Sequence, residues 1–444
     1  MLYRVFKWLF YLTVRGYFRS IHIKGKEQIP ANGPVIFVAN HNSAFMDPIL
    51  LAVHISRPIY FLARGESFTS KLVSVIFGWL HMIPIYKPEV SPDEVYKNKT
   101  IFQKCFDHLG QGKTIMIFPE GVSETVRKLR PVKTGTARIA LGAEQQNDFE
   151  LGVRIIPIGI NYSNPHYFRS DVYVEVGSPI LLDEYQKPYN SDPVATVQEL
   201  TASIKVRLEQ LIVNVHDQSI EQLVKDIERL YRTELREEMS EEHKASQDFY
   251  LSQEIVKAVN YNSQTRPRKS LKFQQKIRRY FKVLDQLNIS DADFRKTGDN
   301  PLSILLIPYF IFGFPLFLFG FLVNLVPYST VAFLARKIGV RADFIGSMKL
   351  AFGMFVFLVF YILETLIFVS FANWLWGIVF VLSLYPSGLF VVNYINRWYR
   401  FLGYLNYLRL KSSRKDSIGR LRALREELLQ ELDKGRQVYL KGLP

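Results

Sequence analysis

Two long apolar runs constrain this chain most, because neither of them can be exposed to water over its full length. Residues 301–335 contain no charged residue, and residues 350–396 contain only Glu364. A helix that spans a bilayer needs about 20 apolar residues. The second run therefore predicts two membrane spans with a turn near Ala372, Asn373 and Trp374.

The first run is too long for one span and short for two, and it contains Pro308, Pro315 and Pro327. Basic residues dominate residues 266–282, the link at 336–349 and the tail at 397–444. Basic segments beside membrane helices favour the cytoplasmic face. We therefore expect 301–335 to enter the bilayer and return to the same face, as a tight hairpin or a re-entrant pair. Glu364 is either a functional carboxylate inside the membrane or a protonated or paired structural one.

The formal charge of +15 over 444 residues favours anionic partners, namely membrane surfaces, phosphorylated substrates or nucleic acid. The charge lies beside the apolar runs and accompanies no nucleic-acid-binding motif, so no nucleic-acid partner is expected. The lone Cys105 excludes an intrachain disulfide and is expected on a helix as a small apolar residue. No histidine or cysteine spacing predicts a metal site.

Five segments are predicted. They are an interfacial amphipathic helix at 1–20, an α/β domain at 21–215, a basic helical segment at 216–298, a transmembrane region at 299–396 and a basic amphipathic tail at 397–444. In the first segment, basic residues lie on one side of the helix and aromatic residues on the other, as in helices that rest on a membrane.

Strand-like and helix-like runs alternate in the second segment. This alternation predicts an α/β fold with a mixed, largely parallel sheet and flanking helices. The expected strands are 35–38, 59–63, 82–86, 114–118, 153–162 and 172–176, and the expected helices are 48–56, 70–80, 92–109 and 134–146. Ser91 is the expected cap of the third helix. Ligands of such sheets gather at the carboxyl ends of the strands.

His41 follows the first of these strands, and Asp47 lies six residues later. On a continuous helix that offset would place them on different faces. Asp47 and Pro48 read as the N-cap and first residue of the next helix, so a turn must bring the two side chains together. A carboxylate on one imidazole nitrogen leaves the other free to accept a proton. Alternatively, Asp47 only caps its helix.

A second group follows the strand that ends near residue 118. It consists of Phe118, Pro119, Glu120 and Gly121, with Lys133 in the approach to the next helix. A glycine at a strand exit permits close approach to a ligand. By itself this group is also compatible with an ordinary turn.

Together these blocks resemble the glycerolipid acyltransferase family, over about residues 20–215. The shared pattern has Asn and His, a Ser two residues later, a downstream Asp, the Phe-Pro-Glu-Gly block, Lys-x-Gly, and a strand with Pro before a terminal Tyr. In this chain those positions are Asn40, His41, Ser43, Asp47, Phe118 to Gly121, Lys133, Gly135, Pro157 and Tyr162.

Two positions depart from the family pattern. Five residues separate His41 from Asp47, where four are usual, although some eukaryotic glycerol-3-phosphate acyltransferases and related bacterial sequences share the longer gap. The family's basic residue in its second block is usually Arg, whereas Lys87 stands here. Lysine binds phosphate as a point charge, without the fork of arginine. Arg64 is a second candidate, and either cation can instead be a solvated surface residue.

The resemblance implies a membrane-bound O-acyltransferase of phospholipid synthesis. It would move an acyl group from a thioester, acyl-CoA or acyl carrier protein, to glycerol 3-phosphate or lysophosphatidic acid. His41 and Asp47 would be catalytic, and Ser43, Arg64, Lys87, Glu120, Gly121 and Lys133 would contact substrate. No cofactor is implied. The catalytic domain is expected on the cytoplasmic face. The alternatives are an acyltransferase for another lysolipid or an amino lipid, and a non-enzymatic membrane scaffold on the same fold.

Overall fold

The computed structural model describes residues 2–87, 90–215, 217–237, 244–291, 306–338 and 341–442. The chain forms two compact units. The first comprises Met1–His216 together with Leu334–Met354, and the second comprises Asp217–Phe333 and Phe355–Pro444. The N-terminal helix and the link between two apolar helices thus both belong to the first unit.

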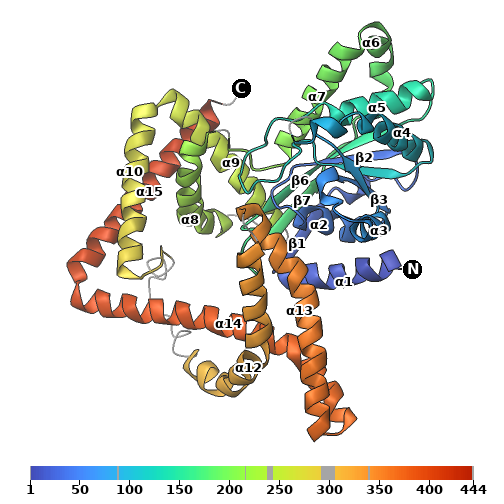
Figure 1. Ribbon diagram of the computed structural model, residues 1–444. Coiled ribbons are helices and arrows are strands. Elements are labelled where there is room, and N and C mark those ends of the chain that lie inside the picture. The colour runs from blue at the N-terminus through green and yellow to red at the C-terminus, as the bar shows by residue number, and fades with distance from the viewer. Residues whose placement is uncertain are drawn as a thin grey trace. The chain divides into compact units, whose positions relative to one another are not determined.

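A seven-stranded sheet organises the first unit, in the order β1-β7-β6-β2-β5-β3-β4 (Figure 1). All neighbouring strands are parallel except β6 and β7, which are antiparallel. The strands are β1 Ser20–Lys24, β2 Val35–Ala39, β3 Ile59–Arg64, β4 Met82–Ile85, β5 Thr114–Ile117, β6 Arg154–Tyr162 and β7 Asp171–Val176. The predicted mixed, largely parallel sheet is confirmed.

Helices cover both faces of this sheet (Figure 1). They are α1 Leu2–Tyr17, α2 Met46–His54, α3 Lys71–Trp79, α4 Lys97–Gly110, α5 Gly135–Gln146, α6 Gln186–Ser191 and α7 Pro193–Gln210. Cys105 is buried on α4, as predicted.

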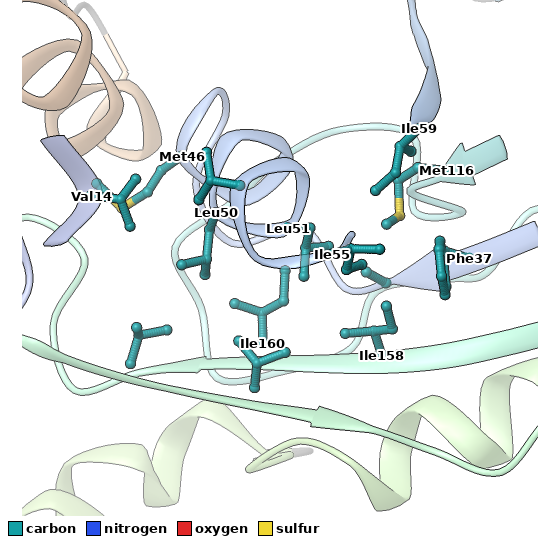
Figure 2. Packing of buried hydrophobic residues seen from close by; sticks show 14 of the residues in the cluster. Val14, Phe37, Met46, Leu50, Leu51, Ile55, Ile59, Met116, Ile158 and Ile160 are labelled. Carbon is teal, nitrogen blue, oxygen red and sulfur yellow. The ribbon is translucent and has the colours of Figure 1, made fainter. Parts of the chain in front are cut away.

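Strand β2 shows why both faces need cover, because all five of its residues are buried. Val35, Phe37 and Ala39 pack into one core with α1 and α2, and Figure 2 shows Leu50 and Leu51 of α2 among this cluster. Ile36 and Val38 enter the core on the other face, with α4, α5 and α7. The alternation follows from the two-residue period of a strand.

Two local features differ from the predictions. Strand β1, Ser20–Lys24, was not predicted, because it is a short, partly exposed edge strand with polar residues at alternate positions. The helix expected from residue 92 begins at Lys97, after a short 3₁₀ turn at Pro92–Glu94. The Ser91 side chain makes no capping hydrogen bond, and its hydroxyl donates to the carboxylate of Glu66.

Helices α1 and α3 expose apolar side chains to their surroundings. On α1, Val14 and Tyr17 are buried, while Val5, Trp8 and Leu12 are exposed. On α3 no residue is buried, and an apolar stripe is exposed, consisting of Leu72, Val75, Ile76 and Trp79. Exposed apolar stripes of this kind mark protein or membrane contact surfaces. This exposure is consistent with the interfacial helix expected at 1–20, which stays a prediction.

The second unit is helical. It contains α8 Glu221–Glu237, α9 Lys244–Thr265, α10 Pro267–Leu287, α15 Lys415–Lys441 and most of α12 Leu306–Ile338, α13 Ala342–Phe371 and α14 Trp374–Ser413. Helices α12, α13 and α14 are long and apolar enough to cross a membrane. Asn373 caps α14 through the Trp376 N–H, which confirms the predicted turn between two spans.

The hairpin or re-entrant pair predicted for 301–335 is wrong for the described residues of that run. Leu306–Ile338 is one continuous α-helix of 33 residues, with Pro315 and Pro327 inside it. Each proline removes one backbone donor and bends a helix, but neither needs to reverse the chain. Residues 301–305 lie outside the described part of the chain.

We predict that Leu50→Ala lowers the free energy of unfolding by about 2–5 kcal/mol, because Leu50 is fully buried in the core that contains Phe37. Leu72→Ala removes the same atoms from an exposed position and should change stability by less than about 0.5 kcal/mol. Thermal unfolding of the purified variants measures both. Equal losses would mean that α2 does not cover the sheet as described.

Candidate active site

The predicted site residues converge on the carboxyl ends of parallel strands. His41 follows β2, Glu120 follows β5, Arg64 ends β3 and Lys87 follows β4. These strands run in the same direction, so their carboxyl ends share one edge of the sheet. Tyr162, the last residue of β6, belongs to the same edge because β6 is parallel to β2.

His41 and Asp47 form a hydrogen-bonded pair, with 2.8 Å between His41 Nδ1 and an Asp47 carboxylate oxygen. The Asp47 side chain is fully buried and the His41 side chain is 16% exposed. An ionised carboxylate only accepts, so Nδ1 carries the proton and Nε2 is left as a proton acceptor. The imidazole stacks on the ring of Phe118, with 4.2 Å between ring centroids, which fixes its plane.

The Asp47 carboxylate has further partners that hold it in place. The Ser43 N–H donates to the same oxygen as His41, at 2.8 Å, and the Tyr162 hydroxyl donates to the other oxygen, at 2.7 Å. Tyr162 was expected as the terminal Tyr of a strand in the family pattern, but its bond to Asp47 was not predicted.

The prediction that Asp47 caps its helix is wrong. Helix α2 begins at Met46 after Phe45, so Asp47 lies in the first turn. The cap comes from Ser347 of α13, whose hydroxyl oxygen accepts the N–H groups of Phe45 and Met46, at 3.0 and 3.1 Å. Because Ser347 satisfies these donors, the Asp47 carboxylate is available to His41.

Arg341 and the first turns of α13 contact both halves of the site. The Ser43 hydroxyl donates to the Asp343 carbonyl and is hydrogen-bonded to Ser347, while the Ser123 hydroxyl donates to the Asp343 carboxylate. Arg341 pairs with Asp343 and donates to the Ser123 carbonyl. The predicted substrate contact at Ser43 stays a prediction, while in this structure its side chain is fully buried and hydrogen-bonded to Asp343 and Ser347.

Glu120 connects the two predicted groups through the backbone. One carboxylate oxygen accepts the His41 N–H at 2.7 Å, and the other accepts the Arg130 N–H at 3.1 Å. Glu120 is 5% exposed. Burial raises the pKa of Glu120 to about 7, although the two N–H donors and the nearby His41 and Arg130 oppose that rise. Substrate contact at Glu120 stays a prediction.

Two lysines flank Gly121. The Lys87 ammonium donates to the Gly121 carbonyl, and a Cβ built on Gly121 would lie 3.2 Å from Lys87 Nζ and 3.6 Å from Lys133 Cδ. Gly121 also has a φ of +73°, which disfavours any side chain there. The structure thus brings Lys87, Gly121 and Lys133 together. Arg64 is the register partner of Ile85 in the parallel pair β3 and β4, so it lies at the same edge of the sheet.

A small cavity of about 40 Å³ borders this site. Asn40 and Tyr162 line it together with Arg127 and Lys128, two cations that sequence analysis did not select. Asn40 bonds the backbone of β6 in both directions, donating to the Ile160 carbonyl and accepting its N–H. Asn40 thereby holds the end of β2 next to β6.

Residues 20–161 match the Acyltransferase family. The glycerol-3-phosphate O-acyltransferase 1 of Saccharomyces cerevisiae is 25% identical over 53% of this chain and 42% of its own length. The glycerol-3-phosphate O-acyltransferase 2 of the same yeast is 35% identical over 31% of this chain and 19% of its own length. This chain therefore spans less than half of the length of these relatives.

A bacterial relative is shorter than the two yeast proteins. The 1-acyl-sn-glycerol-3-phosphate acyltransferase of Borreliella burgdorferi is 25% identical over 38% of this chain and 66% of its own length. Residues 20–161 are therefore an acyltransferase domain similar to those of glycerol-3-phosphate and 1-acylglycerol-3-phosphate acyltransferases.

Proposed function

We propose that this chain is a membrane-bound O-acyltransferase that transfers a fatty acyl group from a thioester to glycerol 3-phosphate or lysophosphatidic acid. One observation carries the proposal. The buried Asp47 carboxylate holds His41 Nδ1 at 2.8 Å, beside a glycine flanked by two lysines. Relatives that match this domain are glycerol-3-phosphate and 1-acylglycerol-3-phosphate acyltransferases.

In the proposed reaction, His41 Nε2 accepts the proton of the acceptor hydroxyl while its oxygen attacks the thioester carbonyl. Asp47 orients the ring and stabilises the imidazolium that forms. The carbon–sulfur bond then breaks, and the departing thiolate takes the proton from the imidazolium. The thioester is already activated, so the reaction needs no covalent acyl-enzyme. Acyl-CoA and acyl carrier protein are both suitable donors.

The acceptor phosphate is proposed to bind between Lys87 and Lys133. Ammonium groups attract a phosphate as point charges. Because Gly121 has no side chain, the space next to both lysines is left for the phosphate. The carbonyl that Lys87 now contacts would be exchanged for phosphate oxygens. Arg64, at the same edge, is proposed as an additional cation.

We further propose that α12 does not cross the membrane and that the acyltransferase domain faces the cytoplasm. Residues 217–299 carry charged residues throughout, so no span separates α10 from that domain. The other end of α12 leads to Arg341 and Asp343, which bond Ser123 of the domain. Both ends of α12 must therefore lie on the same face of the membrane. Helix α13 then crosses the membrane to the opposite face, and α14 crosses back.

The tail supports this arrangement. Helix α15 follows α14, and it pairs with α10 through Lys276, which lies 2.8 Å from Glu427 and 2.5 Å from Glu431. The segments before α12 and after α14 therefore share one side. All three basic flanks then lie on that side, as the distribution of lysine and arginine around membrane helices favours.

Single cysteines in a Cys105→Ala background test this topology. Arg268→Cys on α10 and Arg336→Cys near the end of α12 should be labelled by an impermeant thiol reagent from the same face. Asn373→Cys, in the turn after α13, should be labelled only from the opposite face. Labelling of positions 268 and 336 from opposite faces would show that α12 crosses.

His41→Ala removes the proposed base and should lower kcat by about 10²- to 10⁴-fold, with the membrane-inserted fold retained. The measurement is acyl transfer by purified protein to glycerol 3-phosphate and to lysophosphatidic acid, each with acyl-CoA and with acyl carrier protein. Near-wild-type turnover by the variant would refute the mechanism. If the wild-type protein transferred no acyl group to glycerol 3-phosphate and none to lysophosphatidic acid, the proposed function would be refuted.

Lys87→Ala should raise the KM for the phosphorylated acceptor more than the KM for the acyl donor, because it removes a phosphate contact. Lys128→Ala is a matched control, since that lysine lines the small cavity instead of flanking Gly121. Initial rates with each substrate varied in turn give both constants. An equal change in the two KM values for Lys87→Ala would exclude Lys87 from phosphate binding.

The raised pKa of Glu120 leads us to predict that the stability of the fold depends on pH. Burial raises its pKa from 4.5 to about 7, so the unfolded chain releases this proton at lower pH than the folded protein does. The carboxyl therefore destabilises the fold increasingly as pH rises from 4.5 to about 7. The stability of wild-type protein relative to Glu120→Gln should fall across that window, as measured by thermal unfolding. A constant or rising difference would contradict the burial effect.

A further inference from the structure

A cavity of about 830 Å³ lies among α8, α9, α10 and α15 of the second unit. Pockets that bind small molecules typically measure about 300–1,000 Å³. All of its lining residues belong to the second unit, so it is separate from the His41 site.

The wall of this cavity is apolar. Buried side chains from three of its helices form it, namely Leu223, Ile227, Ile255, Val259 and Tyr439. Such a surface is favourable for an alkyl chain, because the transfer of methylene groups from water to an apolar environment is favourable.

Exposed cations edge the same cavity. Arg266, Lys269, Lys272 and Lys434 line it and make no ion pair within the described part of the chain. The carboxylates that also line it are already neutralised, because Glu254 lies 2.7 Å from Lys257 and Glu431 lies 2.5 Å from Lys276. The lining therefore has an apolar interior and a positive edge that no described carboxylate neutralises.

We propose that this cavity binds a single-chain lipid with a phosphate headgroup. The alkyl chain lies against Ile227, Ile255 and Val259, and the phosphate pairs with Lys269, Lys272 and Arg266. A neutral lipid would leave these cations without an anion, and free phosphate would leave the apolar wall in contact with water. The site does not depend on the reaction proposed at His41.

The test uses full-length protein in phosphatidylcholine nanodiscs and hexadecyl phosphate with a diazirine near the end of its alkyl chain. This probe has no hydroxyl that could be acylated. After irradiation, mass spectrometry should find label on peptides of α9 and α15. Unlabelled hexadecyl phosphate should compete, whereas inorganic phosphate and hexadecyl glycerol should not.

A matched pair of variants separates specific binding from general attraction of anions. Lys269→Glu with Lys272→Glu should lower cavity labelling about tenfold or more. Arg268→Glu with Arg279→Glu changes the charge of the same helix equally, at exposed positions that do not line the cavity, and should lower it less than about twofold. Equal losses in the two variants, or label confined to α12, α13 and α14, would overturn the proposal.

Ser347 carries a second and independent inference. Its hydroxyl oxygen accepts the N–H groups of Phe45 and Met46 and lies 3.1 Å from Ser43 Oγ. Ser43 gives its own proton to the Asp343 carbonyl, so Ser347 donates to Ser43. All hydrogen-bonding capacity of this fully buried side chain is thus directed at the turn that carries Asp47.

We infer that Ser347 is a positioning residue for the His41–Asp47 pair, an inference that rests on the proposed function. Ser347→Ala leaves the buried N–H group of Met46 and the part-buried N–H group of Phe45 unpaired, which frees the start of α2 and the adjacent Asp47 to shift. A small displacement of a catalytic group can cost a large factor in rate. The membrane helix α13 would thereby fix the geometry of the catalytic turn.

Ser347→Ala should lower kcat about tenfold or more with both KM values unchanged, and Ser347→Thr should restore part of the loss. Ser370→Ala is the control, because that hydroxyl bonds only the backbone of its own helix, at the Ile367 carbonyl. Unchanged kcat in Ser347→Ala while His41→Ala is inactive would overturn this inference alone. Activity in His41→Ala would instead overturn the proposed function.

Discussion

The buried carboxylate of Asp47 is the group on which the candidate site depends. A carboxylate removed from water is costly unless donors surround it. Asp47 is fully buried and accepts hydrogen bonds from the Ser43 backbone, the Tyr162 hydroxyl and the His41 ring. These donors come from the turn after β2 and from the end of β6. The parallel register of the two strands is therefore what satisfies the charge and orients the imidazole.

The link into α13 adds a contribution that the sheet does not supply. Ser347 caps α2, and Asp343 holds Ser43 through its carbonyl and Ser123 through its carboxylate. Apolar stripes on α1 and α3, with Trp8 and Trp79 exposed, give the same unit surfaces suited to a bilayer. The candidate site and the exposed apolar stripes therefore lie in the same unit of this chain.

The sheet and half of the site could be predicted because their signals are local. Buried strands such as Val35–Ala39 show apolar runs, and the residues that follow them reach one sheet edge. Ser347 could not be predicted, since it lies 304 positions from Ser43 and looks like any serine in an apolar helix. The cap assigned to Asp47 was wrong for the same reason. The reversal expected within 301–335 rested on the basic segments at its two ends, whereas the structure shows one continuous helix, Leu306–Ile338.

The most direct test of the central claim is a comparison of His41→Ala, Asp47→Asn and the double variant in single-turnover acyl transfer. Residues that act as one unit have strongly non-additive effects. If Asp47 works only through the imidazole, the double variant should be no slower than His41→Ala. Additive losses, or an Asp47→Asn enzyme with wild-type turnover, would show that the carboxylate does not support the base.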